Sequence, residues 1–239
     1  METKENWILV LLAGQSNMAG RGEVEPGDRE EIPGLMKMNR ELQWVPAVEP
    51  VTEDRAFAGV GPGRTFGRLL LEANPGCMVG LVPVAVGGTP ISAWKRGGCS
   101  PWNDQEHPYD DAVRRARAAL ERGQFAAVLW HQGETDAKQK NLHYADDLKE
   151  VIGNFREDLP LSGVPFLCGE LGHYLKGGPY DFPQIDADIR RVVSELPDLG
   201  WVSAEGLTDK GDGLHFSASS AREFGRRYFE EYLRMMAQH

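Results

Sequence analysis

Three residues of this sequence could carry out nucleophilic catalysis if the fold brought them together. Ser16 stands in the cluster Gly14-Gln15-Ser16-Asn17-Met18, and Asp212 and His215 stand three residues apart in the glycine-rich stretch 208–217. A serine hydroxyl becomes a useful nucleophile only when a base takes its proton and a third group orients that base. Asp212 can reach Nδ1 of His215 and leave Nε2 free, which is the pair that Ser16 would need. The alternative is that Asp212 is an ordinary turn residue and His215 a surface group.

Acyl transfer also needs hydrogen-bond donors for a developing oxyanion. Gly87 and Gly88 allow backbone N–H groups to approach a ligand closely, and the side chain of Gln132 offers an amide. The backbone N–H of Ser16 would complete the set. Taken separately, the two glycines could simply form a turn after a strand, and Gln132 could simply cap the end of a strand.

These residues follow apolar segments that alternate with amphipathic ones. Apolar runs at 7–12, 78–86, 126–130, 165–170 and 201–203 are typical of buried strands, and a short strand is possible at 43–45. Helical periodicity covers about 64–73, 109–122, 139–158, 182–196 and 218–236. Continuous apolar strands separated by helices predict a parallel sheet covered on both faces, an α/β/α fold in one domain over 1–239.

This architecture predicts where the polar residues meet. Ligands of open parallel sheets bind beyond the carboxyl ends of the strands. Ser16, the Gly87-Gly88 pair and Gln132 each follow a predicted strand directly. We therefore expect them to converge on one edge of the sheet.

Four sequence blocks together resemble the SGNH-hydrolase superfamily. They are 14–18, 87–94 (Gly-Gly-Thr-Pro-Ile-Ser-Ala-Trp), 131–136 (His-Gln-Gly-Glu-Thr-Asp) and 212–215 (Asp-Gly-Leu-His). Gln15 and Gln132 stand where the broad superfamily usually has Asp and Asn. This departure narrows the resemblance to carbohydrate esterase family 6 and the sialate O-acetylesterase-like proteins.

The resemblance implies roles for individual residues. Ser16 would be the nucleophile, His215 the base and Asp212 the orienting acid, with the oxyanion held by the Ser16 N–H, by Gly87 or Gly88, and by the Gln132 side chain. It also implies a flavodoxin-like sheet of about five parallel strands. Glu134, one residue beyond Gly133, could support His215 or a substrate hydroxyl, or could instead be buried against Arg64 or a helix N-terminus.

Composition excludes several classes of partner. The 239 residues carry a formal net charge of −10, which disfavours nucleic acid and anionic membranes. No apolar run approaches the length of a membrane span. Three scattered cysteines and six histidines without ligand spacing predict neither a disulfide framework nor a metal site, and no cofactor is expected.

Without a recognisable signal peptide we expect a cytoplasmic protein, or a secreted one if an export signal was trimmed. The oligomeric state is left open.

The function predicted on this basis is a serine esterase that removes O-acetyl groups from carbohydrate, similar to acetylxylan esterases, with small acetyl esters as further substrates. Sialate O-acetylesterase or another acyl-ester hydrolase is the alternative within enzymes. A carbohydrate-binding module without turnover is the alternative outside them. Trp94 and Trp102 flank a glycine-rich loop and could stack on sugars or belong to a small core.

Overall fold

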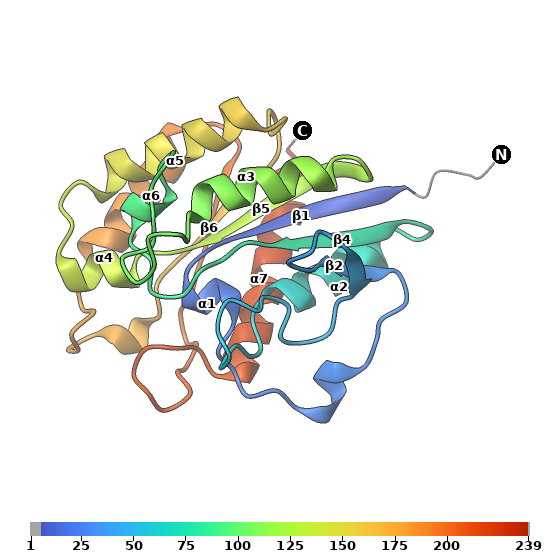
Figure 1. Ribbon diagram of the computed structural model, residues 1–239. Coiled ribbons are helices and arrows are strands. Elements are labelled where there is room, and N and C mark those ends of the chain that lie inside the picture. The colour runs from blue at the N-terminus through green and yellow to red at the C-terminus, as the bar shows by residue number, and fades with distance from the viewer. Residues whose placement is uncertain (1–5, 239) are drawn as a thin grey trace.

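The chain folds around one seven-stranded sheet with helices on both faces, as the computed structural model shows for residues 6–238 (Figure 1). The strands are β1 (Trp7–Gly14), β2 (Leu35–Met38), β3 (Trp44–Pro46), β4 (Met78–Pro83), β5 (Gly123–His131), β6 (Phe166–Gly169) and β7 (Leu199–Val202). Their order is β3-β2-β4-β1-β5-β6-β7. Only β3 pairs in the antiparallel sense, with β2; the other strand pairs are parallel.

The predicted α/β/α fold is confirmed, and the sheet is wider than the five strands expected. Two strands are additional to those five. One is β3, which the sequence suggested as a possible short strand, and the other is β2, whose four residues Leu-Met-Lys-Met lie inside a long polar segment and are too short to give a periodic signal. Lys37 of β2 is nevertheless buried, because its ammonium donates to the Pro50 carbonyl and pairs with Glu53.

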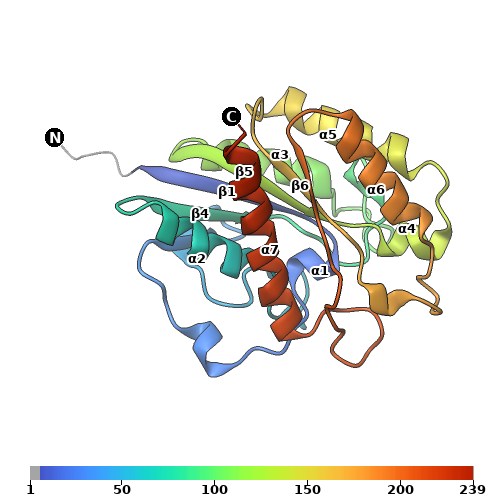
Figure 2. The same ribbon diagram turned by 180° about the vertical axis from the view of Figure 1, so that it is seen from behind.

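Helices cover the two faces unequally. On one face lie α2 (Gly63–Ala73) and α7 (Ala218–Met236), which pack against each other and appear in front in Figure 2. On the other lie α3 (Pro108–Ala119), α5 (Tyr144–Asp158) and α6 (Gln184–Glu195). Shorter helices occupy the loops: α1 (Ser16–Ala19), α4 (Glu134–Gln139), and the 3-10 turns η1 (Pro26–Arg29), η2 (Ile91–Trp94) and η3 (His173–Leu175). Within residues 6–238, no helix combines the length and apolar character needed to cross a membrane.

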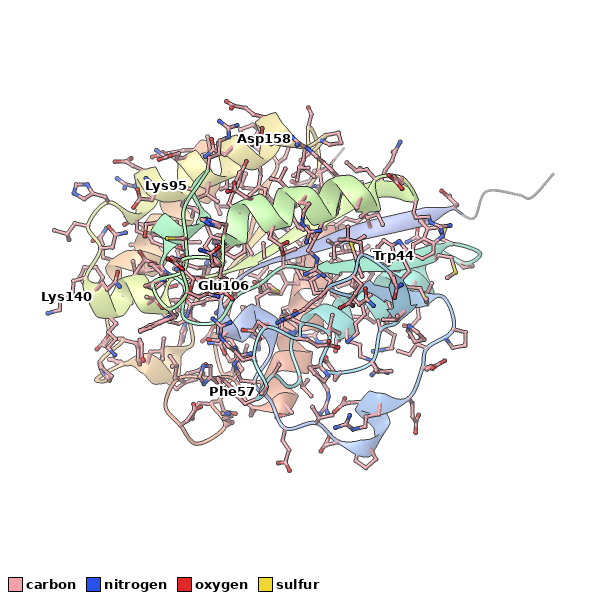
Figure 3. The ribbon with its side chains drawn as sticks, in the orientation of Figure 1. Trp44, Phe57, Lys95, Glu106, Lys140 and Asp158 are labelled. Carbon is pink, nitrogen blue, oxygen red and sulfur yellow. The ribbon has the colours of Figure 1, made fainter. Side chains whose placement is uncertain are left out.

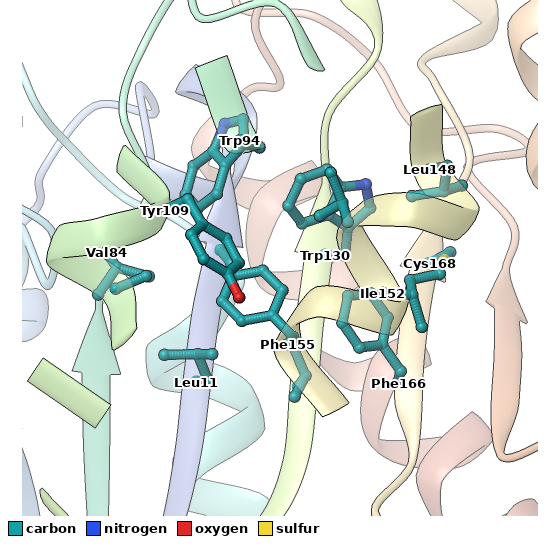
Figure 4. Close-up of a cluster of buried hydrophobic side chains, with 14 of the residues drawn as sticks. Leu11, Val84, Trp94, Tyr109, Trp130, Leu148, Ile152, Phe155, Phe166 and Cys168 are labelled. Atoms are coloured by element: carbon teal, nitrogen blue, oxygen red, sulfur yellow. The ribbon is translucent and has the colours of Figure 1, made fainter. Parts of the chain in front are cut away.

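Strand β1 divides the hydrophobic core into two layers. Leu9 and Leu11 pack in the cluster beneath α3 and α5, whereas Val10 and Leu12 pack in the cluster beneath α2 and α7. Figure 4 shows the first cluster, in which Trp94 meets Trp130 edge to face with ring centroids 5.2 Å apart. Burial of β1 on both faces explains its continuous apolar sequence.

The central position of β1 places the end of this strand in the middle of the sheet edge. It lies between β4 and β5, where the chain switches from building one side of the sheet to building the other. Gly14 ends β1 at a φ of +127°, and a Cβ atom there would lie 2.1 Å from the His131 carbonyl oxygen. Only glycine allows this approach, which turns the chain directly into Ser16.

Candidate active site

Ser16, His215 and Asp212 form a continuous hydrogen-bonded chain at the carboxyl edge of the sheet. Ser16 begins α1, which only Gln15 separates from the end of β1, and its Oγ lies 3.1 Å from Nε2 of His215. Nδ1 of the same ring lies 2.8 Å from Oδ2 of Asp212. Ser16 and His215 are 199 positions apart in the chain, and the fold brings them together with Asp212 in the geometry of a nucleophile, a base and an orienting acid.

The local loop holds Asp212 in an ionised state. Burial raises the pKa of the Asp212 carboxyl, but hydrogen bonds from the backbone N–H and the imidazole of His215 and from the Leu214 N–H outweigh it and bring the pKa down to about 2. A carboxylate that is ionised at neutral pH accepts a hydrogen bond from Nδ1–H of His215 and so leaves Nε2 as the basic nitrogen facing Ser16.

The backbone supplies two candidate donors for an oxyanion. Within the described chain, the N–H groups of Ser16 and Gly88 have no hydrogen-bond acceptor. Gly88 adopts a φ of +80°, which favours glycine. The N–H of Gly87 is different, because it donates to Oδ2 of Asp54 at 2.8 Å. Of the two glycines suggested by the sequence, Gly88 therefore has the available donor.

Gln132 does not lie as expected for an oxyanion donor. Its side chain is fully buried, and its Nε2 donates to Oδ2 of Asp136 at 2.6 Å and to the Thr89 carbonyl at 3.1 Å. Both amide hydrogens are thus engaged within the protein. Gln132 instead ties the end of β5 to the segment after Gly88, and so holds the candidate oxyanion site in shape.

Glu134 does not support His215 directly. It is fully buried at the start of α4, where Oε1 lies 3.1 Å from Nε2 of His131 and accepts a hydrogen bond of 2.5 Å from Nδ2 of Asn17. Glu134 therefore lies at a helix N-terminus, which was one of the two buried positions expected for it. It is not buried against Arg64, because the Arg64 guanidinium donates to the Ala47 and Glu30 carbonyls. Burial raises the pKa of Glu134, but His131 and Asn17 outweigh it and hold the pKa below its usual value.

Asn17 connects Glu134 to the loop that carries His215, a role that the sequence did not reveal. Its Nδ2 also donates to the Leu214 carbonyl at 3.1 Å, and its Oδ1 accepts from the Phe216 N–H at 3.0 Å. Leu214 and Phe216 are the two chain neighbours of His215. The residue after the nucleophile thereby fixes the backbone on both sides of the base.

A buried ion pair supports the other side of the nucleophile. Arg21 and Asp54 form two hydrogen bonds, of 3.1 and 2.7 Å, and both side chains are almost completely buried. Oδ2 of Asp54 also accepts the Gly87 N–H, and a Cβ atom on Gly87 would lie 3.5 Å from Cβ of Ser16. The ion pair therefore positions the segment that ends in Gly88.

Comparison with known proteins identifies the family. A family model described as carbohydrate esterase, sialic acid-specific acetylesterase, matches residues 6–234. The chain belongs to this family. It is a carbohydrate acetylesterase, a carboxylic ester hydrolase.

Relatives of known structure resemble the esterase over nearly its whole length. A probable carbohydrate esterase of Arabidopsis thaliana is 30% identical over 250 residues, covering 94% of this chain and 90% of the relative. An Arabidopsis thaliana crystal structure at 29% identity has a TM-score of 0.82 and covers 96% of this chain and 98% of its own. The structure of NanS, at 21% identity, has a TM-score of 0.78 with complete coverage of both chains, and shows a shared fold.

Asn17 of the esterase provides a test of how the base is positioned. Asn17→Ala removes two hydrogen bonds that hold the His215 loop, and one to Glu134, without touching the triad. We expect kcat for 4-nitrophenyl acetate to fall by about 10²-fold with little change in KM, because small displacements of catalytic groups cost about that much. Asn74→Ala, which removes an asparagine from the end of α2, is the control. Equal rates for the two variants would contradict the positioning role.

The Arg21–Asp54 pair predicts a large effect on stability. Asp54→Ala leaves the Arg21 guanidinium buried without its carboxylate, so we expect the free energy of unfolding to fall by about 3–5 kcal/mol. Glu53→Ala is the matched control, because Glu53 is mostly exposed and its pair with Lys37 should contribute at most about 1 kcal/mol. Urea denaturation measures both, and similar losses in the two variants would contradict this account.

Two exposed aromatic rings flank the site. Trp102 is 72% exposed, and its Nε1 donates to the Gly88 carbonyl at 3.4 Å. Phe57, labelled in Figure 3, is 69% exposed. Cζ of the Arg21 guanidinium lies 5.1 Å from the centroid of its ring. Trp94, by contrast, is fully buried and donates to Thr89, so it belongs to the core. The sequence could not show which of the two tryptophans is buried and which is exposed. Of the two, Trp102 is the one whose ring is available to a ligand.

Proposed function

We propose that the esterase removes O-acetyl groups from carbohydrate by a serine mechanism in which Ser16 is the nucleophile, His215 the general base and acid, and Asp212 the residue that orients and stabilises His215. The observation that carries this proposal is the continuous chain of contacts from Asp212 Oδ2 to His215 Nδ1 at 2.8 Å and from His215 Nε2 to Ser16 Oγ at 3.1 Å.

The reaction proceeds in two acyl-transfer steps. Ser16 Oγ attacks the acetyl carbonyl carbon while His215 Nε2 takes the hydroxyl proton, and the N–H groups of Ser16 and Gly88 bind the oxyanion. The bond from the acetyl carbon to the sugar oxygen then breaks, and the imidazolium returns the proton to that oxygen. Water attacks acetyl-Ser16 with His215 again as base, releasing acetate and restoring the serine hydroxyl.

The finer assignment that we propose is an acetylxylan esterase-like enzyme of the carbohydrate esterase family 6 type. Gln15 and Gln132, at their places in the first and third blocks, support this branch. Sialate O-acetylesterase is the second candidate, favoured by the description of the matching family. A non-catalytic binding module is no longer a candidate, because the chain is a carboxylic ester hydrolase.

Hydrolysis of four esters tests the proposal, with release of 4-nitrophenol measured for the two 4-nitrophenyl esters and release of acetate for the two carbohydrates. We expect wild-type enzyme to hydrolyse 4-nitrophenyl acetate faster than the octanoate, and acetylated xylan faster than O-acetylated sialic acid. A preference for the octanoate would contradict acetyl specificity. A higher kcat/KM for O-acetylated sialic acid would favour the sialate esterase.

A further inference from the structure

Side chains hold the backbone on both sides of the candidate oxyanion donor, the Gly88 N–H. On the preceding side, the Gly87 N–H donates to Oδ2 of Asp54 at 2.8 Å. On the following side, the Gly88 carbonyl accepts from Thr135 Oγ1 at 3.2 Å and from the Trp102 indole at 3.4 Å. The peptide before Gly87 and the peptide after Gly88 are therefore fixed in orientation.

The peptide between Gly87 and Gly88, which carries the donor itself, is held at one point. Its carbonyl oxygen, that of Gly87, lies 3.5 Å from Nη2 of Arg55 and accepts from no other group within the described chain. A glycine on each side leaves a peptide free to rotate, because no Cβ atom obstructs the motion. Reversal of this peptide would bring the Gly87 carbonyl oxygen to the position of the Gly88 N–H and would replace a donor with an acceptor.

The charge of Arg55 favours the orientation that catalysis needs. A cation attracts the negative end of a carbonyl dipole and repels the positive end of an N–H dipole. The distance of 3.5 Å is long for a hydrogen bond, but this attraction does not depend on linear geometry. Reversal of the peptide would set the Gly88 N–H against the guanidinium, so Arg55 disfavours it.

A carboxylate from another loop holds the Arg55 guanidinium in place. Nη1 and Nη2 lie 2.9 and 3.0 Å from the two carboxylate oxygens of Glu106, which is labelled in Figure 3. The hydrogen bonds from Arg55 lower the pKa of the Glu106 carboxyl, so that it is ionised at neutral pH. Such a two-point pair fixes the direction of a guanidinium as well as its place. It joins the loop between β3 and α2 to the loop between β4 and α3.

From this arrangement we infer that Arg55 is a positioning residue for the oxyanion site: its guanidinium holds the Gly87 carbonyl and thereby keeps the Gly88 N–H directed at the developing oxyanion. The inference rests on the proposed function and deepens it, because it takes the Gly88 N–H as an oxyanion donor. Arg55 acts through the backbone and takes no part in proton transfer.

Two variants of Arg55 test the inference. Arg55→Ala removes the cation, whereas Arg55→Lys keeps one. Arg227→Ala is the matched control, because Arg227 is similarly exposed, at 25% against 28% for Arg55, pairs with Glu223 and donates to two backbone carbonyls away from the site. Each ion pair is partly exposed, so both alanine variants should fold.

Steady-state hydrolysis of 4-nitrophenyl acetate gives kcat and KM for each protein. Inhibition by ethylboronic acid gives a second readout, because boronic acids form a tetrahedral adduct with a serine nucleophile and so resemble the transition state. Loss of an oxyanion donor weakens binding of that adduct. A general loosening of the loop would instead impair binding of the ester, which is measured as a rise in KM.

Arg55→Ala should lower kcat by about 10²-fold and leave KM within about threefold of wild type, because loss of one oxyanion donor has an effect of that size on the transition state alone. The inhibition constant of ethylboronic acid should rise about tenfold or more in the same variant. Arg55→Lys should keep kcat within about tenfold of wild type, since a cation still faces the Gly87 carbonyl. Arg227→Ala should match wild type in all three quantities.

The inference is overturned if Arg55→Ala keeps wild-type kcat, if its kcat falls without weaker inhibition by ethylboronic acid, or if its loss appears only in KM. Equal losses of kcat in Arg55→Ala and in either Arg55→Lys or Arg227→Ala would also overturn it. Ser16→Ala tests the proposed function separately. Turnover retained by Ser16→Ala rejects the serine mechanism, whereas an inactive Ser16→Ala beside a fully active Arg55→Ala rejects only the role of Arg55.

Discussion

Ser16→Ala should lower kcat for 4-nitrophenyl acetate by about 10⁴-fold or more, because the variant has no atom that can form the acyl-enzyme. Ser16 Oγ is the atom that His215 Nε2 contacts at 3.1 Å, and no other hydroxyl contacts that nitrogen within the described chain. Initial rates at neutral pH, with a chelator present to remove adventitious metal, measure the effect. The protein should remain folded, since the change removes one oxygen atom, whose one hydrogen bond within the described chain is to Nε2 of His215.

Ser219→Ala is a suitable control for this experiment. Ser219 begins the exposed side of α7 and contacts only Ser217 among the side chains described. It should retain wild-type rates. Appreciable turnover by Ser16→Ala, at more than a few per cent of wild type, would show that another group carries the reaction.

Asp212→Asn is expected to lower kcat by about 10³–10⁴-fold. The carboxylate accepts from Nδ1 of His215 at 2.8 Å, and its other oxygen accepts the backbone N–H groups of Leu214 and His215. If those N–H groups keep the amide oxygen, the amide nitrogen faces Nδ1 and donates to it. The proton then moves to Nε2, and the ring can no longer accept the proton of Ser16.

Asp209→Asn separates this effect from damage to the loop. Asp209 lies in the same loop and accepts the N–H groups of Gly211 and Gly213, but it does not contact His215. We expect that variant to keep kcat within about tenfold of wild type, the scale of one weakened hydrogen bond. Equal losses in the two variants would show that Asp212 acts through loop structure alone.

Much of the fold could be predicted because its strands are buried on both faces. β1, β4 and β5 give continuous apolar runs, and the long helices give clear 3.6-residue periodicity. β2 could not be predicted in the same way. Its four residues form a strand only because β4 lies beside them, and this pairing depends on tertiary contacts.

The site could be predicted as a set of residue types but not as a set of contacts. The position of Ser16 after a predicted strand and the resemblance to SGNH hydrolases together pointed to Ser16, His215 and Asp212. The structure places these three residues in one chain of hydrogen bonds. Nothing local showed that the Gln132 amide would turn toward Asp136. Likewise Asn17 and Phe216, which lie 199 residues apart, meet only once the sheet has formed.

Covalent labelling tests most directly whether Ser16 is the nucleophile. The wild-type enzyme would be treated with diethyl 4-nitrophenyl phosphate, a serine-directed reagent, and the labelled residue identified by peptide mass spectrometry while remaining activity is followed. The account predicts one diethylphosphoryl group per chain, on Ser16, with activity lost in proportion to labelling and no label on Ser16→Ala. Label on a different residue, or loss of activity without modification of Ser16, would contradict it.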